Sequence, residues 1–138
     1  GAAVVNGYLS HFDVNWLFLS GDEARHHAPG MGLLYLFELP FVLVGIYALI
    51  FGGFFKKSKY LIFSWFLLAP LPASITSGVP HAIRTLNFLP TFQIFTAMGV
   101  INFIGLTRQM RKIKFPIIFF LFSFFIFNFV YYLNQYFV

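Results

Sequence analysis

Two short clusters of arginine and histidine carry the side chains that could do chemistry in this chain. One is Arg25-His26-His27, and the other is His81 with Arg84. Each precedes or opens a predicted helix, and a helix N-terminus has free N–H groups that bind anions, phosphate above all. Arginine adds a planar fork of donors suited to phosphate oxygens. The pattern predicts that Arg25, His26, His81 and Arg84 bind a phosphate, with His27 in support. The competing interpretation is that these side chains only reach toward lipid headgroups.

Acidic residues near these clusters have two interpretations. Asp22 and Glu23 could act together in general-base chemistry, although such a pair more often caps a helix and pairs with a base such as Arg25. Glu38 is unusual because it lies about two turns into an apolar stretch. A carboxylate there is costly, so it is expected to face the interior of a helix bundle or a cavity. Asp22 and Glu38 are therefore possible supporting residues of the phosphate site.

A zinc site is the sharpest alternative use of the histidines. It would draw on His11, His26, His27 and His81, with Asp22 or Glu23. The chain has no His-x-x-x-His or His-Glu-x-x-His spacing, and it has no cysteine for thiolate ligands or disulfides. We therefore predict no metal and no cofactor, with a divalent ion left as an open alternative.

The elements that must position these side chains are long apolar stretches. The chain is 59% hydrophobic and 9% charged, whereas about a quarter of the residues of a soluble domain are charged. We predict an all-α, polytopic membrane protein in which residues 1–30 form an outer segment with an interfacial helix at Val14–Leu19. Four transmembrane helices are expected at about 31–54, 60–76, 80–106 and 115–136.

Basic residues are sorted between the gaps that separate these stretches. Seven of the nine Lys and Arg residues lie in two gaps on one side of the predicted bundle, namely Lys56, Lys57, Lys59, Arg108, Arg111, Lys112 and Lys114. Positive charge in short loops marks the cytoplasmic face. Residues 1–30 and 74–80 are then extracytoplasmic. The net charge of +5 is explained by topology and anionic lipid, and no nucleic-acid partner is expected.

A series of short motifs also resembles a known group of enzymes. They are Tyr8-Leu9-Ser10-His11-Phe12, Trp16-Leu17-Phe18, Gly21-Asp22, Arg25-His26, Pro29-Gly30-Met31-Gly32, Tyr35, Glu38-Leu39-Pro40 and Pro80-His81-Ala82-Ile83-Arg84-Thr85. The chain is similar to the later membrane region of bacterial glycosyltransferases of the GT-C architecture, which include the protein mannosyltransferases (glycosyltransferase family 39-like) and the lipid A aminoarabinose transferase.

The resemblance implies an enzyme of the cell envelope in the bacterial cytoplasmic membrane. Such enzymes transfer a sugar from a polyprenyl-phosphate-linked donor to an acceptor on the extracytoplasmic face. The expected partners are that donor, membrane lipids and the rest of a longer parent chain. The catalytic carboxylate of such enzymes lies in a first outer loop that this sequence lacks. The catalytic residue therefore stays unknown, and the chain is expected to supply lipid-phosphate binding and to be inactive alone.

Two other functions fit the same residues. A transporter or flippase for an anionic lipid could use Glu38 together with kinks at Pro40, Pro70 and Pro90. A non-catalytic membrane subunit could bind an anionic lipid without transferring anything. All three functions share the prediction of an anion site at the outer face.

Overall fold

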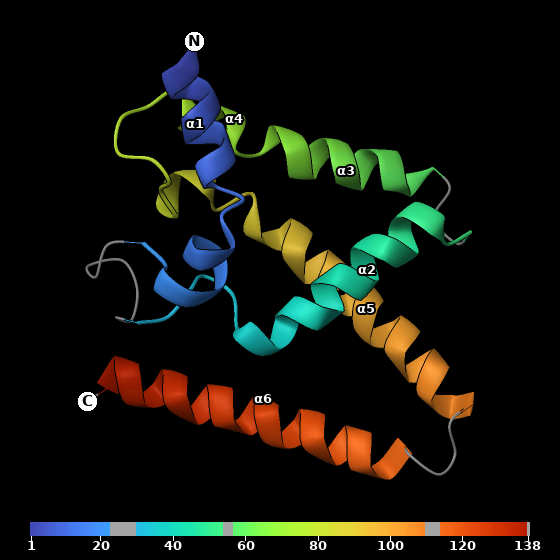
Figure 1. Ribbon diagram of the computed structural model, residues 1–138. Helices are drawn as coiled ribbons and strands as arrows, with labels where there is room; N and C mark the ends of the chain where they lie inside the picture. Colours follow the sequence, from blue (N-terminus) through green and yellow to red (C-terminus); the bar gives the residue numbers. More distant parts are fainter. Residues whose placement is uncertain (23–29, 54–56, 110–113, 138) are drawn as a thin grey trace.

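The computed structural model of the chain describes residues 1–22, 30–53, 57–109 and 114–137 (Figure 1). Every regular element within these ranges is a helix, which confirms the all-α class. In chain order the elements are α1 (Ala2–Ser10), the π-helical turn η1 (Trp16–Ser20), the 3-10 turn η2 (Leu36–Glu38), α2 (Leu39–Phe51), α3 (Ser58–Leu68), α4 (Leu71–Ser74), the 3-10 turn η3 (Ile83–Thr85), α5 (Leu89–Gln109) and α6 (Lys114–Phe137).

Helices α2 and α5 cross in close contact at the centre of the structure (Figure 1). Each helix contributes a Phe-x-x-x-Gly sequence to the crossing. A Cβ on Gly45 would collide with the backbone of Phe95, and a Cβ on Gly99 would collide with the backbone of Phe41. Small residues let two helix backbones approach this closely. The pairing is reciprocal, so both glycines are needed for the observed approach.

An aromatic cluster fills the space above this crossing. The ring of Phe66 in α3 lies 5.2 to 5.4 Å from the rings of Phe12, Phe88, Phe92 and Phe95. Phe88 and Phe95 are almost fully buried. Offset and edge-on ring contacts at this spacing are the favoured geometries. Phe66 therefore joins α3 to α5 and to the segment that follows α1.

Among the residues that the structure describes, two helices, not four, are long and apolar enough to cross a membrane. They are Leu89–Thr107 in α5 and Lys114–Gln135 in α6. At 1.5 Å per residue, the 21 residues of α5 span about 31 Å, which matches a hydrocarbon core of about 30 Å. These two helices indicate membrane association. The predicted number of membrane-length helices was wrong, while the predicted last span at 115–136 agrees closely with α6.

The first predicted span, 31–54, is helical only from Leu36 because the chain before it packs in another way. The amide of Leu34 donates to the carbonyl of Leu17 at 2.8 Å, a contact outside any helix. A Cβ on Gly32 would meet the backbone of Leu17 and Phe18. This close approach holds residues 31–35 against η1 and keeps them out of α2. The apolar run at Val14–Leu19 accordingly enters the core, where Trp16, Leu17 and Phe18 are buried.

Prolines set the limits of the next two predicted spans. The stretch 60–76 divides at Pro70 into α3 and α4, as expected where a proline removes a helical hydrogen bond. The stretch 80–106 becomes α5 only at Leu89, with η3 before it. Pro90 therefore lies in the first turn of α5, where proline is tolerated, and the predicted kink there is absent.

The ends of the helices fall on two sides of the structure. The end of α2, the start of α3, the end of α5 and the start of α6 lie together on the right of Figure 1, and α1, α4 and the C-terminal end of α6 lie on the left. Lys57 and Lys59 adjoin the start of α3, and Lys114 begins α6. The lysines of the described residues thus share one end of the helices, opposite to α1 and α4.

Candidate functional site

The segment that carries His81 and Arg84 connects α4 to α5. The Thr85 hydroxyl donates to the carbonyl of His81 at 2.8 Å, and the Thr85 amide donates to Ala82 at 3.1 Å. These bonds close the single turn η3. The sequence predicted the N-terminus of a long helix here, able to bind an anion. That expectation was wrong, because η3 spans three residues and the first amides of the turn are already bonded to side chains.

One of these side chains is His11, which follows α1. Its Nε2 accepts the backbone amide of His81 at 3.4 Å, and its Nδ1 lies 2.7 Å from the carbonyl of Gly7. A carbonyl oxygen only accepts, so Nδ1 carries the proton. The side chain is completely buried, and its ring packs edge-on against Trp16 at 5.5 Å. Burial lowers the pKa of His11 by disfavouring the charged form, and the hydrogen bonds to Gly7 and Tyr8 oppose that shift.

The other side chain is Asp22. Its carboxylate accepts the backbone amide of Ala82 at 2.7 Å and lies 3.7 Å from Nδ1 of His81. The Asp22 side chain is 7% exposed, and that of His81 is 21% exposed. The backbone amide of Ala82, one of those predicted to face an external anion, is therefore occupied by the chain's own carboxylate. The segment that Asp22 was expected to cap lies outside the described residues. The Asp22 carboxylate approaches the His81 imidazole, and part of the His81 side chain stays exposed.

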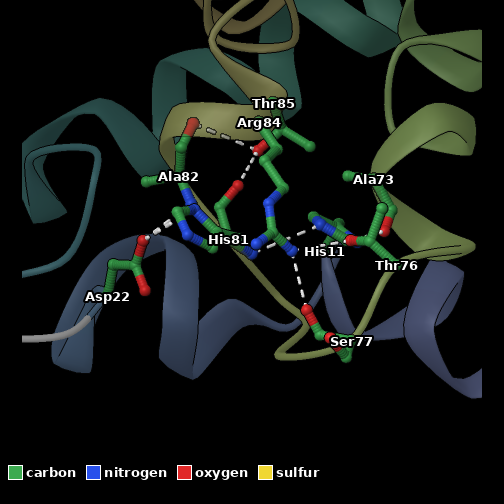
Figure 2. Close-up of polar contacts among 9 residues, drawn as sticks. All are labelled: His11, Asp22, Ala73, Thr76, Ser77, His81, Ala82, Arg84 and Thr85. Carbon is green, nitrogen blue, oxygen red and sulfur yellow. Dashed lines mark hydrogen bonds and ion pairs between the residues drawn. The ribbon is translucent and has the colours of Figure 1, made fainter.

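Arg84 is exposed but held in one orientation. Its Nη1 donates to the hydroxyl of Thr76 at 2.8 Å and to the carbonyl of Ser77 at 2.7 Å. The Thr76 hydroxyl in turn donates to the carbonyl of Ala73 at 2.7 Å. Figure 2 shows the Arg84 side chain extended toward Thr76 and Ser77, and the Asp22 carboxylate directed at the backbone of His81 and Ala82. Within the described residues, Nε and Nη2 of Arg84 have no hydrogen bond, so that edge of the guanidinium remains open.

The other predicted site residues do not join this cluster. Arg25, His26 and His27, with Glu23, lie outside the described residues. Glu38 is buried where η2 meets α2, and its carboxylate accepts the Thr96 hydroxyl of α5 at 3.3 Å. It was expected two turns into a helix but stands at the start of one, where a negative charge is favoured by the helix dipole. Its bonds tie α2 to α5 and do not reach His81 or Arg84.

No group of three or more metal-ligating side chains forms among residues 1–22, 30–53, 57–109 and 114–137. His11 and His81 do come together, as the zinc alternative required. Both ring nitrogens of His11 are used by backbone groups, so this histidine has no lone pair for a metal. The indole N–H of Trp16 is buried beside it without a hydrogen-bond partner.

Two clefts of about 190 and 280 Å³ lie elsewhere, between α6 and residues 30–36. Their walls include Met31 and Leu34 on one side and Tyr131 or Tyr132 of α6 on the other. Neither cleft is lined by His81 or Arg84. In the cluster, Arg84 is exposed and His81 is partly exposed, whereas the side chains of His11 and Asp22 are buried.

Sequence reasoning missed three members of the cluster. His11 was considered only as a zinc ligand, and Thr76 and Ser77 were treated as part of a turn. The sequence carries only a weak local signal for the contacts of Thr76 and Ser77 with Arg84. Both are hydroxyl residues beside a glycine turn, and they stand eight and seven positions before that arginine. Nothing in the sequence near His11 indicates a contact with residue 81, because that contact depends on the fold.

These features define a class: an all-helical, membrane-associated protein with a His–Asp–Arg cluster at the end opposite to Lys57, Lys59 and Lys114. No family model, no curated protein and no solved structure matches the chain. The fold and the cluster are therefore the grounds for any statement about function.

Proposed function

We propose that this chain is part of a membrane glycosyltransferase and binds the phosphate of a polyprenyl-phosphate-linked sugar donor. The sugar is transferred to an acceptor on the extracytoplasmic face of the bacterial cytoplasmic membrane. In this proposal Arg84 and His81 hold the lipid phosphate as the sugar leaves, and Asp22 supports His81. Arg25, His26 and His27, which lie outside the described residues, stay predicted members of the site. The resemblance to GT-C enzymes and the chemistry of the cluster support it.

The open edge of Arg84 carries the proposal. With Nη1 occupied by Thr76 and Ser77, Nε and Nη2 present two parallel N–H donors. That geometry matches two oxygens of a phosphate, and such charge-assisted pairs are about twice as strong as neutral hydrogen bonds. Because the side chain is already oriented, less rotamer entropy is lost on binding. His81 lies three positions earlier, just before η3, and its side chain is 21% exposed.

The arrangement of the helix ends supports the proposed topology. The cluster adjoins α1 and α4, opposite to Lys57, Lys59 and Lys114 (Figure 1). In the proposal the lysine end faces the cytoplasm, and residues 1–30 and 74–80 lie outside. α5 and α6 cross as single helices. In the proposal the stretches that contain α2 and α3–α4 also cross the membrane.

A binding experiment tests the phosphate site. The protein is reconstituted in lipid nanodiscs, and binding of decaprenyl phosphate is compared with binding of the uncharged alcohol decaprenol by native mass spectrometry. The phosphate should bind more tightly, and Arg84→Ala should weaken it about tenfold to a hundredfold, as the loss of charge-assisted hydrogen bonds predicts. Arg84→Lys should bind decaprenyl phosphate with intermediate affinity, because lysine keeps the positive charge but lacks the planar fork of donors.

Lys59→Ala is the matched control, since it removes a positive charge at the opposite end of the helices. It should bind decaprenyl phosphate as the unchanged protein does. Equal binding of phosphate and alcohol, or full binding by Arg84→Ala, would refute the phosphate site. A transporter or flippase would share this binding but require the site to open to both faces. Reagents that reach residue 77 from one face only would favour the transferase over the transporter.

A further inference from the structure

His11 makes two contacts that only one of its protonation states allows. Nδ1 must carry a hydrogen to donate to the carbonyl of Gly7, and Nε2 must lack one to accept the amide of His81. In a protonated His11, the Nε2–H would face the backbone N–H of His81, and two donors cannot form a hydrogen bond. Protonation of His11 therefore removes the contact to His81 and leaves the contact to Gly7 unchanged.

Among the described residues, two backbone amides next to η3 donate to side chains of the N-terminal segment. The amide of His81 donates to His11, and the amide of Ala82 donates to the Asp22 carboxylate. Arg84 follows within η3. Loss of the His11 contact would release the amide of His81 from His11, while the Asp22 contact would still hold the chain at Ala82. The expected change is local and does not require unfolding.

We propose that His11 is a positioning residue for the anion site, one that holds the His81 backbone in its neutral form and releases it when protonated. Acid should then weaken phosphate binding through His11 itself. The inference rests on the proposed function, because the bound anion is taken to be the lipid phosphate. It also makes His11 distinct from Arg84 and His81, since it acts through the backbone and touches no ligand.

The groups that surround His11 set the direction of the effect. Tyr8 and Gly7 of α1 offer carbonyl oxygens, and Trp16 of η1 offers an apolar ring edge. His81 of the α4–α5 connection also lowers the pKa of His11, and Asp22 contacts the His81 ring. Arg84 belongs to the same connection. Burial lowers the pKa of His11, so the neutral form is the one present at pH 7.

Amide hydrogen exchange in nanodiscs tests the release directly. Exchange of the backbone amides of residues 81 and 82 is followed from pH 7.5 to pH 5, with rates corrected for the intrinsic pH dependence. We expect the amide of His81 to lose protection in acid and that of Ala82 to keep it. The variant His11→Gln has an amide donor and an amide acceptor, and its side chain does not titrate. Protection of the residue 81 amide should therefore not depend on pH in this variant. Identical pH profiles in the two proteins would overturn the proposal.

A second variant keeps the test decisive if His11→Gln does not fold. His81→Asn retains the backbone amide and removes the other histidine of the cluster. Loss of protection at residue 81 in acid should persist in His81→Asn, because it depends on His11. Its disappearance there would assign the effect to the His81 side chain and overturn the proposal.

Decaprenyl phosphate binding links the release to function. The phosphate of the lipid itself changes charge near pH 6, so the readout is the difference in affinity between His11→Gln and the unchanged protein at each pH. We expect the unchanged protein to lose about tenfold more affinity than the variant between pH 7.5 and pH 5, a change equivalent to one hydrogen bond. Equal losses would overturn the role of His11. If neither protein binds the lipid at any pH, the proposed function fails, and hydrogen exchange still tests His11.

Discussion

The imidazole of His11 accepts the backbone amide of His81, a residue 70 positions later in the chain, with 3.4 Å between the two nitrogens. The contact joins the segment after α1 to the connection between α4 and α5. Because His11 is fully buried, water does not compete for the bond. The position of the His81–Arg84 turn is thus decided by a side chain from the opposite end of the sequence.

The stability of the protein should fall in acid because of His11. Its pKa is lowered in the folded state, so between that value and the ordinary value of about 6.5 the unfolded chain binds more protons. The stabilisation is complete above about pH 6.5 and is lost as the pH falls through the folded pKa, at about 1.4 kcal/mol for each pH unit of that window. Unfolding of the protein in mild detergent at a series of pH values measures this slope. A variant His11→Gln should show a shallower slope, and an unchanged slope would contradict the assignment.

Thr76 should affect phosphate binding without touching the phosphate. Its hydroxyl accepts Nη1 of Arg84 and donates to the carbonyl of Ala73, so it fixes the guanidinium. Replacement by valine keeps the shape and removes both bonds. Affinity for decaprenyl phosphate should fall about fivefold, equivalent to about 1 kcal/mol. Thr76→Ser retains the hydroxyl and should bind normally, whereas normal binding by Thr76→Val would show that Arg84 needs no such support.

The crossing of α2 and α5 should not tolerate a methyl group at Gly45. The added carbon would collide with the carbonyl of Phe95, so the helices must move apart. Overpacking of this kind costs about 1–3 kcal/mol, measurable as a lower free energy of unfolding in detergent.

Gly105 supplies the matched control, because it lies in α5 with open space where a Cβ would be. Gly105→Ala should stabilise the protein by up to about 1 kcal/mol through helix propensity. If Gly45→Ala were equally harmless, the close crossing would be absent from the protein in solution.

The two ends of the helices should label from opposite faces of the membrane. Ser58 begins α3 at the lysine end, and Ser77 lies in the connection that binds Arg84; both are exposed. The chain has no cysteine, so single cysteines at these positions can be labelled without background. A membrane-impermeant maleimide added to intact cells should react at position 77 and leave position 58 untouched. Reaction at both positions from outside would refute the proposed topology.

Much of the architecture follows from local sequence. The high apolar content and the lack of charge within the stretches predict helices that associate with a membrane, since only helices or closed barrels satisfy their backbone there. The last stretch, 115–136, became α6 at Lys114–Phe137 almost unchanged, because its length and composition alone decide it. Prolines at 70 and 90 marked real helix limits, although the second begins a helix where a kink was predicted.

The length of an apolar run did not predict the length of the helix where tertiary contacts interrupt the run. Residues 31–35 are apolar enough to extend α2, yet Gly32 and Leu34 are held by the backbone of Leu17. No local propensity in either segment encodes that approach. The same cause shortened the predicted helix before Leu89, where His81 and Ala82 bond to His11 and Asp22 in place of a helical partner.

The sequence by itself determined the class of the protein, the sorting of its charges and the identity of Arg84 and His81 as candidate anion ligands. These depend on composition and on side-chain chemistry, which need no coordinates. The tertiary structure alone decided that Asp22 occupies the amide where an external anion was expected, that Thr76 fixes Arg84, and that His11 anchors the turn. The Asp22 and His11 contacts join residues 60 and 70 positions apart, and such pairings form only when the packing of the whole chain brings those residues together.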